Sequence, residues 1–390
     1  MTLLDTASVD GAEPLDARLG GLSGRRAGAP SRWTARMRLA LGLSPTPRPG
    51  LVLIPLGMAL GPHGLGVLSD PVMTIVDPAV SVALAALGAF VGMNLEFRRA
   101  RAGFFLFAAS LEGAITLLTV AAGILTVHAL SPGTEGTPWL LAVMLGIAAA
   151  PSSTAAASAA KPRLQRAAHV GDLDDVLPIV VGLVALAAVR EDAPLAIARV
   201  SGLAALLALT IGVAGWLLVS RTSSVTEERV FAIGALLLLG GAAAYLSLSA
   251  LFAGFVAGVF WHAAGRDARD RIMRDLGYLQ HPLMALLLVV AGARVQVSAQ
   301  VAGLVAVYLV CRITGKLIGG WLATIGGGEL PRDLGLSLIA PGIVGIAYAL
   351  NVVQARGDAD ETAALFAIVI AGSLASDVIS LFVRGQDHPA

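Results

Sequence analysis

The chain has 390 residues, of which 56% are hydrophobic and 14% charged, and its mean hydropathy is +0.81. A soluble domain has about a quarter charged residues, so this chain has too few polar side chains to cover a water-soluble globule of its size. The arginines behind the net charge of +1 stand in short segments between apolar runs and indicate no nucleic-acid partner, and a single cysteine excludes an internal disulfide and a cysteine-based metal site.

The N-terminal segment 1–49 is rich in arginine, proline and glycine and has no apolar core, which is not the pattern of a signal peptide. We expect it to be a basic cytosolic tail, largely disordered. A transmembrane domain is predicted over 50–385 and a short cytosolic C-terminus over 386–390. No nucleotide-binding motif is found, so we expect no nucleotide and no cofactor, and transport energy would come from an ion gradient or a partner subunit.

Long apolar runs with short polar breaks predict an all-α polytopic membrane protein with about 12 transmembrane helices. The expected spans are 50–68, 75–97, 101–130, 137–160, 166–189, 196–219, 229–245, 248–264, 273–293, 301–325, 332–353 and 362–384.

Alternate segments between these spans are basic, as in Arg98–Arg101 and Arg266–Arg274, whereas segments such as Ser131–Pro138 carry no lysine or arginine. The positive-inside rule therefore places both termini in the cytosol, as an even number of spans requires, and we expect the inner (plasma) membrane. Four arginines do not follow the alternation: Arg190, Arg199, Arg294 and Arg356.

Two spans are interrupted at matching places, the fourth by Pro151–Thr154 and the eleventh by Pro341–Gly342. Paired interruptions of this kind are typical of transporters built from two inverted-topology repeats, in which the broken helices form the binding site.

Asp174 and Asp175 lie inside the fifth span. A carboxylate at the middle of a bilayer costs roughly 2.5–3.5 kcal/mol on insertion scales, so such residues face water or a charged partner. Adjacent helical positions point about 100° apart, so one aspartate can face an ion path while the other meets a neighbouring helix. The alternative is that the span begins later and leaves all three aspartates of this stretch in a cytosolic loop, Asp172 included.

Lys316 is one of two lysines among 27 basic residues, and it lies within the apolar tenth span. Lysine, unlike arginine, can lose its charge on burial, so this choice favours a titrating partner. Asp175 and Lys316 each lie about 14 Å from the inner ends of their spans, at the same depth. The alternative is a lysine that extends its side chain to the cytosol.

Glu112 and Asp377 lie at similar depth, and either could pair with Lys316 or with Arg312, one turn earlier on the same helix. We interpret Glu112 and Asp377 as structural ion-pair partners rather than ligands of a transported ion.

Ser152, Ser153 and Thr154 could supply hydroxyls and freed carbonyls to a dehydrated cation. The alternative is ordinary bonding of these hydroxyls to the backbone of a bent helix. His128 and His262 stand at helix ends, where we expect interfacial positions.

The chain resembles the monovalent cation:proton antiporter superfamily, which includes bacterial Na+/H+ antiporters and K+/H+ efflux relatives, from about residue 50 to 384. Leu56–Gly66 looks like the glycine-rich end of its early helix, and Leu87–Glu96 is similar to its Leu-Gly…Gly-Leu-Glu segment. Ser152-Ser-Thr-Ala resembles its unwound crossing helix, Asp174-Asp175-Val-Leu its paired-aspartate site, and Gly315-Lys316 its lysine-bearing helix.

The resemblance implies a core bundle of spans three to five and ten to twelve that moves against a dimer-forming panel, and hence a homodimer. It also implies that Asp175 binds a cation or protons while Asp174 pairs with Lys316. We expect that the N-terminal tail does not supply the extra helix that the family often has there, and Pro341–Ile343 stands where many relatives have an Arg/Gly/Glu-type stretch.

We therefore expect a membrane transporter, not an enzyme, that exchanges a monovalent cation (Na+ favoured, K+ as the second choice) for protons by alternating access. If Lys316 releases a proton when the cation arrives, more protons than cations move, so electrogenic exchange is predicted. One alternative is a Na+-coupled organic-anion symporter of the same architecture. Another is an intramembrane aspartyl protease with Asp175 and Asp377 as its dyad; a structural scaffold would have no use for ionisable groups at this depth.

Overall fold

A computed structural model describes residues 49–95, 102–130, 138–153, 162–191, 193–222, 224–296, 299–325, 330–357 and 360–385. Within these ranges the regular structure is helical, apart from one isolated bridge. The helices are α2 (Pro49–Leu60), α3 (Asp70–Asn94), α4 (Ala102–Leu130), α5 (Pro138–Ala149), α6 (Pro162–Leu173), α7 (Val176–Arg190), α8 (Pro194–Arg221), α9 (Val225–Tyr245), α10 (Ala250–Ala263), α11 (Arg266–Ala293), α12 (Ala299–Ile325), α13 (Leu334–Ser337), α14 (Ile343–Arg356) and α15 (Asp360–Gly385). Residues 1–48 of the predicted tail, the predicted C-terminus and Thr154 lie outside the described residues.

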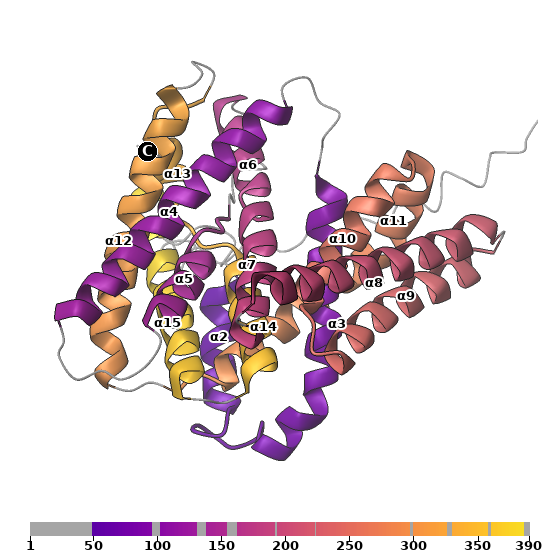
Figure 1. Ribbon diagram of the computed structural model, residues 1–390, viewed down its shortest axis with the longest axis horizontal. Helices are drawn as coiled ribbons and strands as arrows, with labels where there is room; N and C mark the ends of the chain where they lie inside the picture. The colour runs from indigo at the N-terminus through magenta and orange to yellow at the C-terminus, as the bar shows by residue number, and fades with distance from the viewer. Residues whose placement is uncertain are drawn as a thin grey trace, which may run out of the picture. The chain divides into compact units, whose positions relative to one another are not determined.

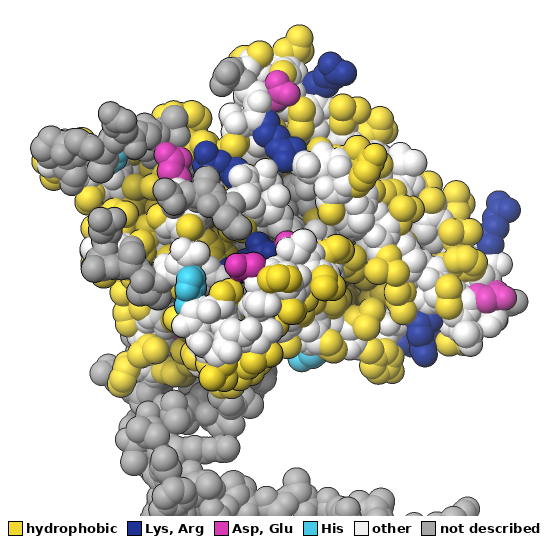
Figure 2. Space-filling view, turned by 90° about the horizontal axis from the view of Figure 1, so that it is seen from below, with side chains coloured by type: hydrophobic (Ala, Val, Ile, Leu, Met, Phe, Trp, Pro, Cys, Tyr) yellow, Lys and Arg dark blue, Asp and Glu magenta, His cyan; other side chains and the backbone are white. Residues whose placement is uncertain are grey.

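The described helices are those of a multi-pass membrane protein. Seven are long and apolar enough to cross a bilayer, and α2, α5, α10 and α14 are shorter apolar helices. Figure 2 shows a face on which hydrophobic side chains dominate and charged ones are few. Such a surface suits lipid rather than water. The all-helical membrane fold is confirmed, whereas the count of 12 crossings stays a prediction.

The helices pack as two groups; in Figure 1, α4 and α12 of the first group lie at the left, and α8, α9 and α11 of the second lie at the right. The first, here called the core group, contains α4–α7 and α12–α15, and the second, the panel group, contains α2, α3 and α8–α11. Helix α14 lies where the groups meet, because it contacts α3, α10 and α11 as well as its own group. The core group contains the spans that the family resemblance assigned to the core bundle, three to five and ten to twelve.

Close contact inside the panel group depends on small residues. Gly88 on α3 and Gly254 on α10 lie where each helix meets the backbone of the other. A Cβ atom at either position would lie about 2 Å from a carbonyl oxygen of the partner helix, 2.0 Å at Gly88 and 1.8 Å at Gly254. Glycine lets two membrane helices approach in this way, so that they gain van der Waals contact without steric clash.

The two predicted interruptions meet. Helix α5 ends at Ala149 and α14 begins at Ile343, and the extended residues beside them form an antiparallel bridge between Ser152 and Pro341. The amide of Ser153 donates to the carbonyl of Ala340 at 2.9 Å, and the amide of Gly342 donates to the carbonyl of Pro151 at 3.1 Å. The crossing of two broken helices is thereby confirmed.

The fifth predicted span is also interrupted, which the sequence-based prediction of one continuous helix did not foresee. Helix α6 ends at Leu173 and α7 begins at Val176, so Asp174 and Asp175 form the junction. Pro178 has no N–H to donate to the carbonyl four residues earlier, that of Asp174, and this missing bond weakens the helix at the junction.

Candidate functional site

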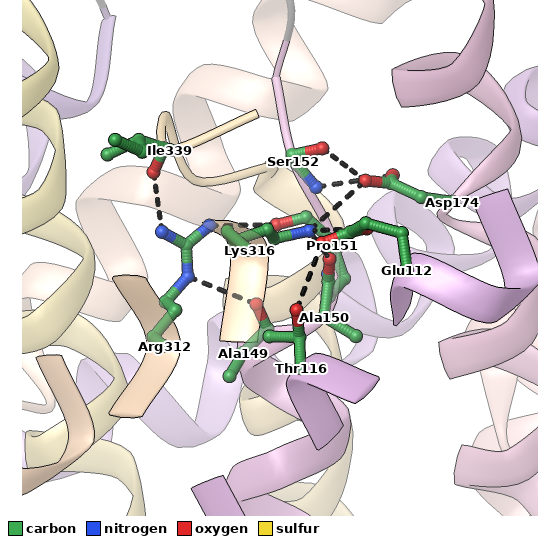
Figure 3. Close-up of polar contacts among 10 residues, drawn as sticks. All are labelled: Glu112, Thr116, Ala149, Ala150, Pro151, Ser152, Asp174, Arg312, Lys316 and Ile339. Carbon is green, nitrogen blue, oxygen red and sulfur yellow. Dashed lines mark hydrogen bonds and ion pairs between the residues drawn. The ribbon is translucent and has the colours of Figure 1, made fainter. Parts of the chain in front are cut away.

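Lys316 lies at the centre of a buried polar cluster beside the crossing (Figure 3). It comes from α12, and its Nζ lies 3.1 Å from Glu112 Oε2 and 3.4 Å from Asp174 Oδ2. The same ammonium group donates to the carbonyl of Ala150. All three charged side chains are fully buried, so Lys316 does not reach the cytosol as the alternative interpretation required.

Glu112 is fixed from α4 in two ways. Thr116, one turn along α4, donates its hydroxyl to Glu112 Oε1 at 2.9 Å. Helices α4 and α12 also lie close together, because a Cβ at Gly315 would lie 2.7 Å from Thr116 Cα and one at Gly319 would lie 3.0 Å from Glu112 Cα. These two glycines, four residues apart, bring the backbone that carries Lys316 within reach of Glu112.

Asp174 is held by the first broken segment. The amide of Ser152 donates to Asp174 Oδ1 at 3.2 Å, and the Ser152 hydroxyl donates to Asp174 Oδ2. Together with Lys316, these contacts satisfy both carboxylate oxygens. Asp174 is fully buried, which differs from the alternative in which it lay in a cytosolic loop.

Arg312 joins the two broken segments. Its Nε donates to the carbonyl of Ala149 at 3.0 Å, and its guanidinium also donates to the carbonyls of Pro151, at 3.1 Å, and Ile339. These carbonyls follow the C-terminal ends of α5 and α13, where backbone acceptors lack helical partners and the helix dipole is negative. A cation at this position therefore satisfies groups that the interruptions leave unpaired. From the sequence, Arg312 was one of two possible partners for Glu112 or Asp377, and the structure instead bonds its guanidinium to backbone carbonyls.

Asp175 faces a cavity of about 670 Å³ between the core and panel groups. The residue is half-buried, and its Oδ1 has no hydrogen-bond partner within the described part of the chain. Polar side chains share the cavity with it: Asn94, His169, Asp172, Arg269 and Gln280. Neighbouring aspartates thus have different surroundings, since Asp174 is fully bonded inside the core, whereas Asp175 borders the cavity and has a buried Oδ1 without a partner among the described residues.

Asp377 and Ser153 line a second, smaller cavity of about 210 Å³ beside Pro341 and Gly342. Met284 and Ile343 belong to the walls of both cavities. The structure therefore places Ser153 near the crossing but in a different cavity from Asp175. The role of Ser153 and Thr154 in a cation site stays a prediction, as do the roles of the other charged residues.

Of the residues predicted from the sequence, the structure brings together Asp174, Lys316 and Glu112. Of the two adjacent aspartates, Asp174 is the one whose carboxylate contacts the lysine. One contributor, Thr116, was not singled out from the sequence, although its spacing of one helical turn from Glu112 could have predicted their hydrogen bond. Ser152 was expected to serve a cation, and its bonds to Asp174 had no signal in the sequence, because the two residues lie on segments that are far apart along the chain. No group of three or more potential metal ligands occurs in the described ranges, and the absence of a cofactor stays a prediction.

The sequence matches no family model, and no curated protein is similar enough to be paired with it. Among solved structures, the sodium proton antiporter MjNhaP1 from Methanocaldococcus jannaschii is similar, with a TM-score of 0.64 and 17% identity over 91% of this chain and 95% of that one. This chain has the fold of a sodium proton antiporter. That is the fold which the resemblance to the monovalent cation:proton antiporter superfamily implied, and it agrees with a core group, a panel group and two crossing broken helices.

Proposed function

We propose that this protein exchanges a monovalent cation for protons across a membrane by alternating access, with Asp175 as the group that binds either one. The observation that carries the proposal is the unequal surroundings of the two aspartates. Asp174 is bonded to Ser152 and Lys316, whereas Asp175 has a carboxylate oxygen without a partner and faces a polar cavity. A proton and a cation compete for one such carboxylate, and this competition couples their movements.

The fold supports the proposal independently, because a similar structure belongs to a sodium proton antiporter. Helix α14 starts at the crossing and contacts both groups, so a movement of the core group against the panel group would open and close the cavity beside Asp175. Na+ is our first expectation for the cation, and K+ the second.

Proton flux in proteoliposomes tests this function. Pulses of Na+, K+ or Li+ are added to purified protein in vesicles that contain a pH-reporting dye, and flux is expected with at least one cation. Asp175→Asn should abolish it. Asp270→Asn is the matched control, because Asp270 is an exposed residue at the start of α11, and it should keep the flux. Folded protein that gives no flux with any cation over several pH values would refute the proposal.

The two alternatives are less consistent with the geometry. A protease dyad needs its carboxyl groups side by side, but Asp175 and Asp377 line separate cavities. An organic-anion symporter needs a site that attracts an anion, whereas the larger cavity contains Asp172 and Asp175 against Arg269. The similarity of fold to a transporter also argues against an enzyme.

Both termini are proposed to be cytosolic, in the inner membrane. Three of the four arginines that do not follow the alternation of basic segments have partners within the protein. Arg294 pairs with Asp77, Arg356 lies 3.6 Å from Glu361, and Arg190 donates to the carbonyl of Ala355. These three arginines therefore count less as evidence against the orientation that the positive-inside rule gives. Asn94 and Arg269, at the basic ends of α3 and α11, line the cavity of Asp175, so we place that cavity on the cytosolic side. A homodimer formed through the panel group is also proposed.

A further inference from the structure

Lys316 has a carboxylate on each of two sides. Glu112 Oε2 lies 3.1 Å from its Nζ and Asp174 Oδ2 lies 3.4 Å from it, and the three side chains are fully buried. Each carboxylate is anchored on its own segment, Glu112 by Thr116 on α4 and Asp174 by Ser152 on the broken segment. The lysine can therefore lose one partner and still keep the other.

The second carboxylate matters at the moment when a cation binds. Asp175 is the next residue after Asp174, so a cation bound there attracts the Asp174 carboxylate and competes with Lys316 for it. If Asp174 were the sole counter-ion, the ammonium would be left buried and unpaired, a state that costs several kcal/mol and is relieved by release of its proton. Glu112 removes that need, because the ammonium stays paired with it.

We infer that Glu112 is a positioning residue that keeps Lys316 protonated throughout the cycle, so that one cation exchanges for one proton without net charge movement. This inference rests on the proposed function. In each cycle a cation leaves Asp175 as one proton arrives, and the charges cancel. Release of a second proton from Lys316 would instead carry one net positive charge. The sequence-based prediction of electrogenic exchange assumed that Lys316 releases a proton when the cation arrives, and the pairing with Glu112 leads to the opposite expectation.

Null-point measurements in proteoliposomes test the stoichiometry. A fixed gradient of the transported cation is imposed, and the proton gradient at which flux is zero is determined with and without a membrane potential set by thiocyanate diffusion. For one-to-one exchange this null point occurs where the proton and cation ratios are equal, and the potential does not move it. For two protons per cation the null point shifts by about half a pH unit for about 59 mV of potential.

The expected result for the unaltered protein is no shift with potential. A shift of the null point with potential in the unaltered protein would overturn the inference while leaving cation/proton exchange standing. Absence of any cation-dependent proton flux would overturn both. The two failures are therefore distinguishable in the same vesicles.

Glu112→Gln connects the stoichiometry to the residue. This variant keeps the shape and an oxygen acceptor for Thr116 but removes the counter-charge, so we expect its null point to shift with potential. The double variant Glu112→Gln/Lys316→Gln lacks both charges and should return to a potential-independent null point. An active Glu112→Gln protein with no shift, or a double variant with one, would contradict the role of the pair. If Glu112→Gln does not fold, the null point of the unaltered protein still decides whether exchange is electroneutral.

Discussion

Ser152 donates both its amide and its hydroxyl to the carboxylate of Asp174, which joins the first broken helix to the junction between α6 and α7. Ser152 also forms the bridge to Pro341 in the second broken segment. One residue thus links three of the segments that surround the site, so a movement of either broken segment is transmitted to Asp174.

Replacing Ser152 by alanine should lower the free energy of unfolding by about 1.5–3 kcal/mol, the usual contribution of a buried hydrogen bond to a charged group. Thermal unfolding in detergent measures it. Ser153→Ala is the matched comparison, because Ser153 contributes an amide to the bridge and the substitution keeps that amide. We expect a smaller loss of stability there. Equal losses at the two serines would show that the hydroxyl of Ser152 does not hold Asp174.

Arg312→Lys should destabilise the protein although the charge is kept. A lysine cannot reach three carbonyls in the fixed geometry of a guanidinium, so at least one acceptor at a helix end becomes unpaired. Each buried unpaired acceptor costs about 1–3 kcal/mol. The unfolding temperature of the variant measures the effect, and Arg199→Lys, at an exposed position on α8, should leave it unchanged. If both variants unfold like the unaltered protein, Arg312 does not hold the crossing together.

Gly315→Ala should reduce both stability and cation-dependent proton flux, because the added Cβ would lie 2.7 Å from Thr116 Cα and force α12 away from α4. Separation of these helices lengthens the contact between Lys316 and Glu112. Gly303→Ala is the control on the same helix, since nothing lies within 4 Å of its Cβ, and it should be neutral or slightly stabilising. The flux assay and thermal unfolding are run on both variants. Similar behaviour of the two would argue against close helix contact at Gly315.

A cross-link between the core and panel groups should stop transport. Asn351 on α14 donates to the hydroxyl of Ser249, which precedes α10, at 2.9 Å, so the two side chains face each other across the two groups. The experiment places cysteines at both positions, as Ser249→Cys/Asn351→Cys in a Cys311→Ser background, and joins them with a short cleavable thiol-reactive cross-linker. We expect the cross-link to abolish cation-dependent proton flux and its cleavage to restore the flux. Full activity in the cross-linked protein would exclude movement of α14 against α10 during exchange.

Much of this protein follows from the sequence. Long apolar runs determine that it is a helical membrane protein, since lipid leaves no other way to satisfy the backbone of such segments. The prolines at 151 and 341 predict broken helices, because each lacks an amide hydrogen. Asp174, Asp175 and Lys316 stand out because charged groups are costly at that depth, and the structure places two of them in direct contact.

Only the tertiary structure decided which charges meet. From the sequence, Glu112 and Asp377 were equivalent partners for Lys316, because depth along a span does not say which helix lies next to which. The close approach of α4 and α12 at Gly315 brings Glu112 into contact with Lys316. Arg312 donates instead to the backbone carbonyls at the crossing. The difference between Asp174 and Asp175 also depends on tertiary packing. The junction between α6 and α7 turns the two side chains toward different neighbours, and those neighbours belong to segments that are distant in the sequence.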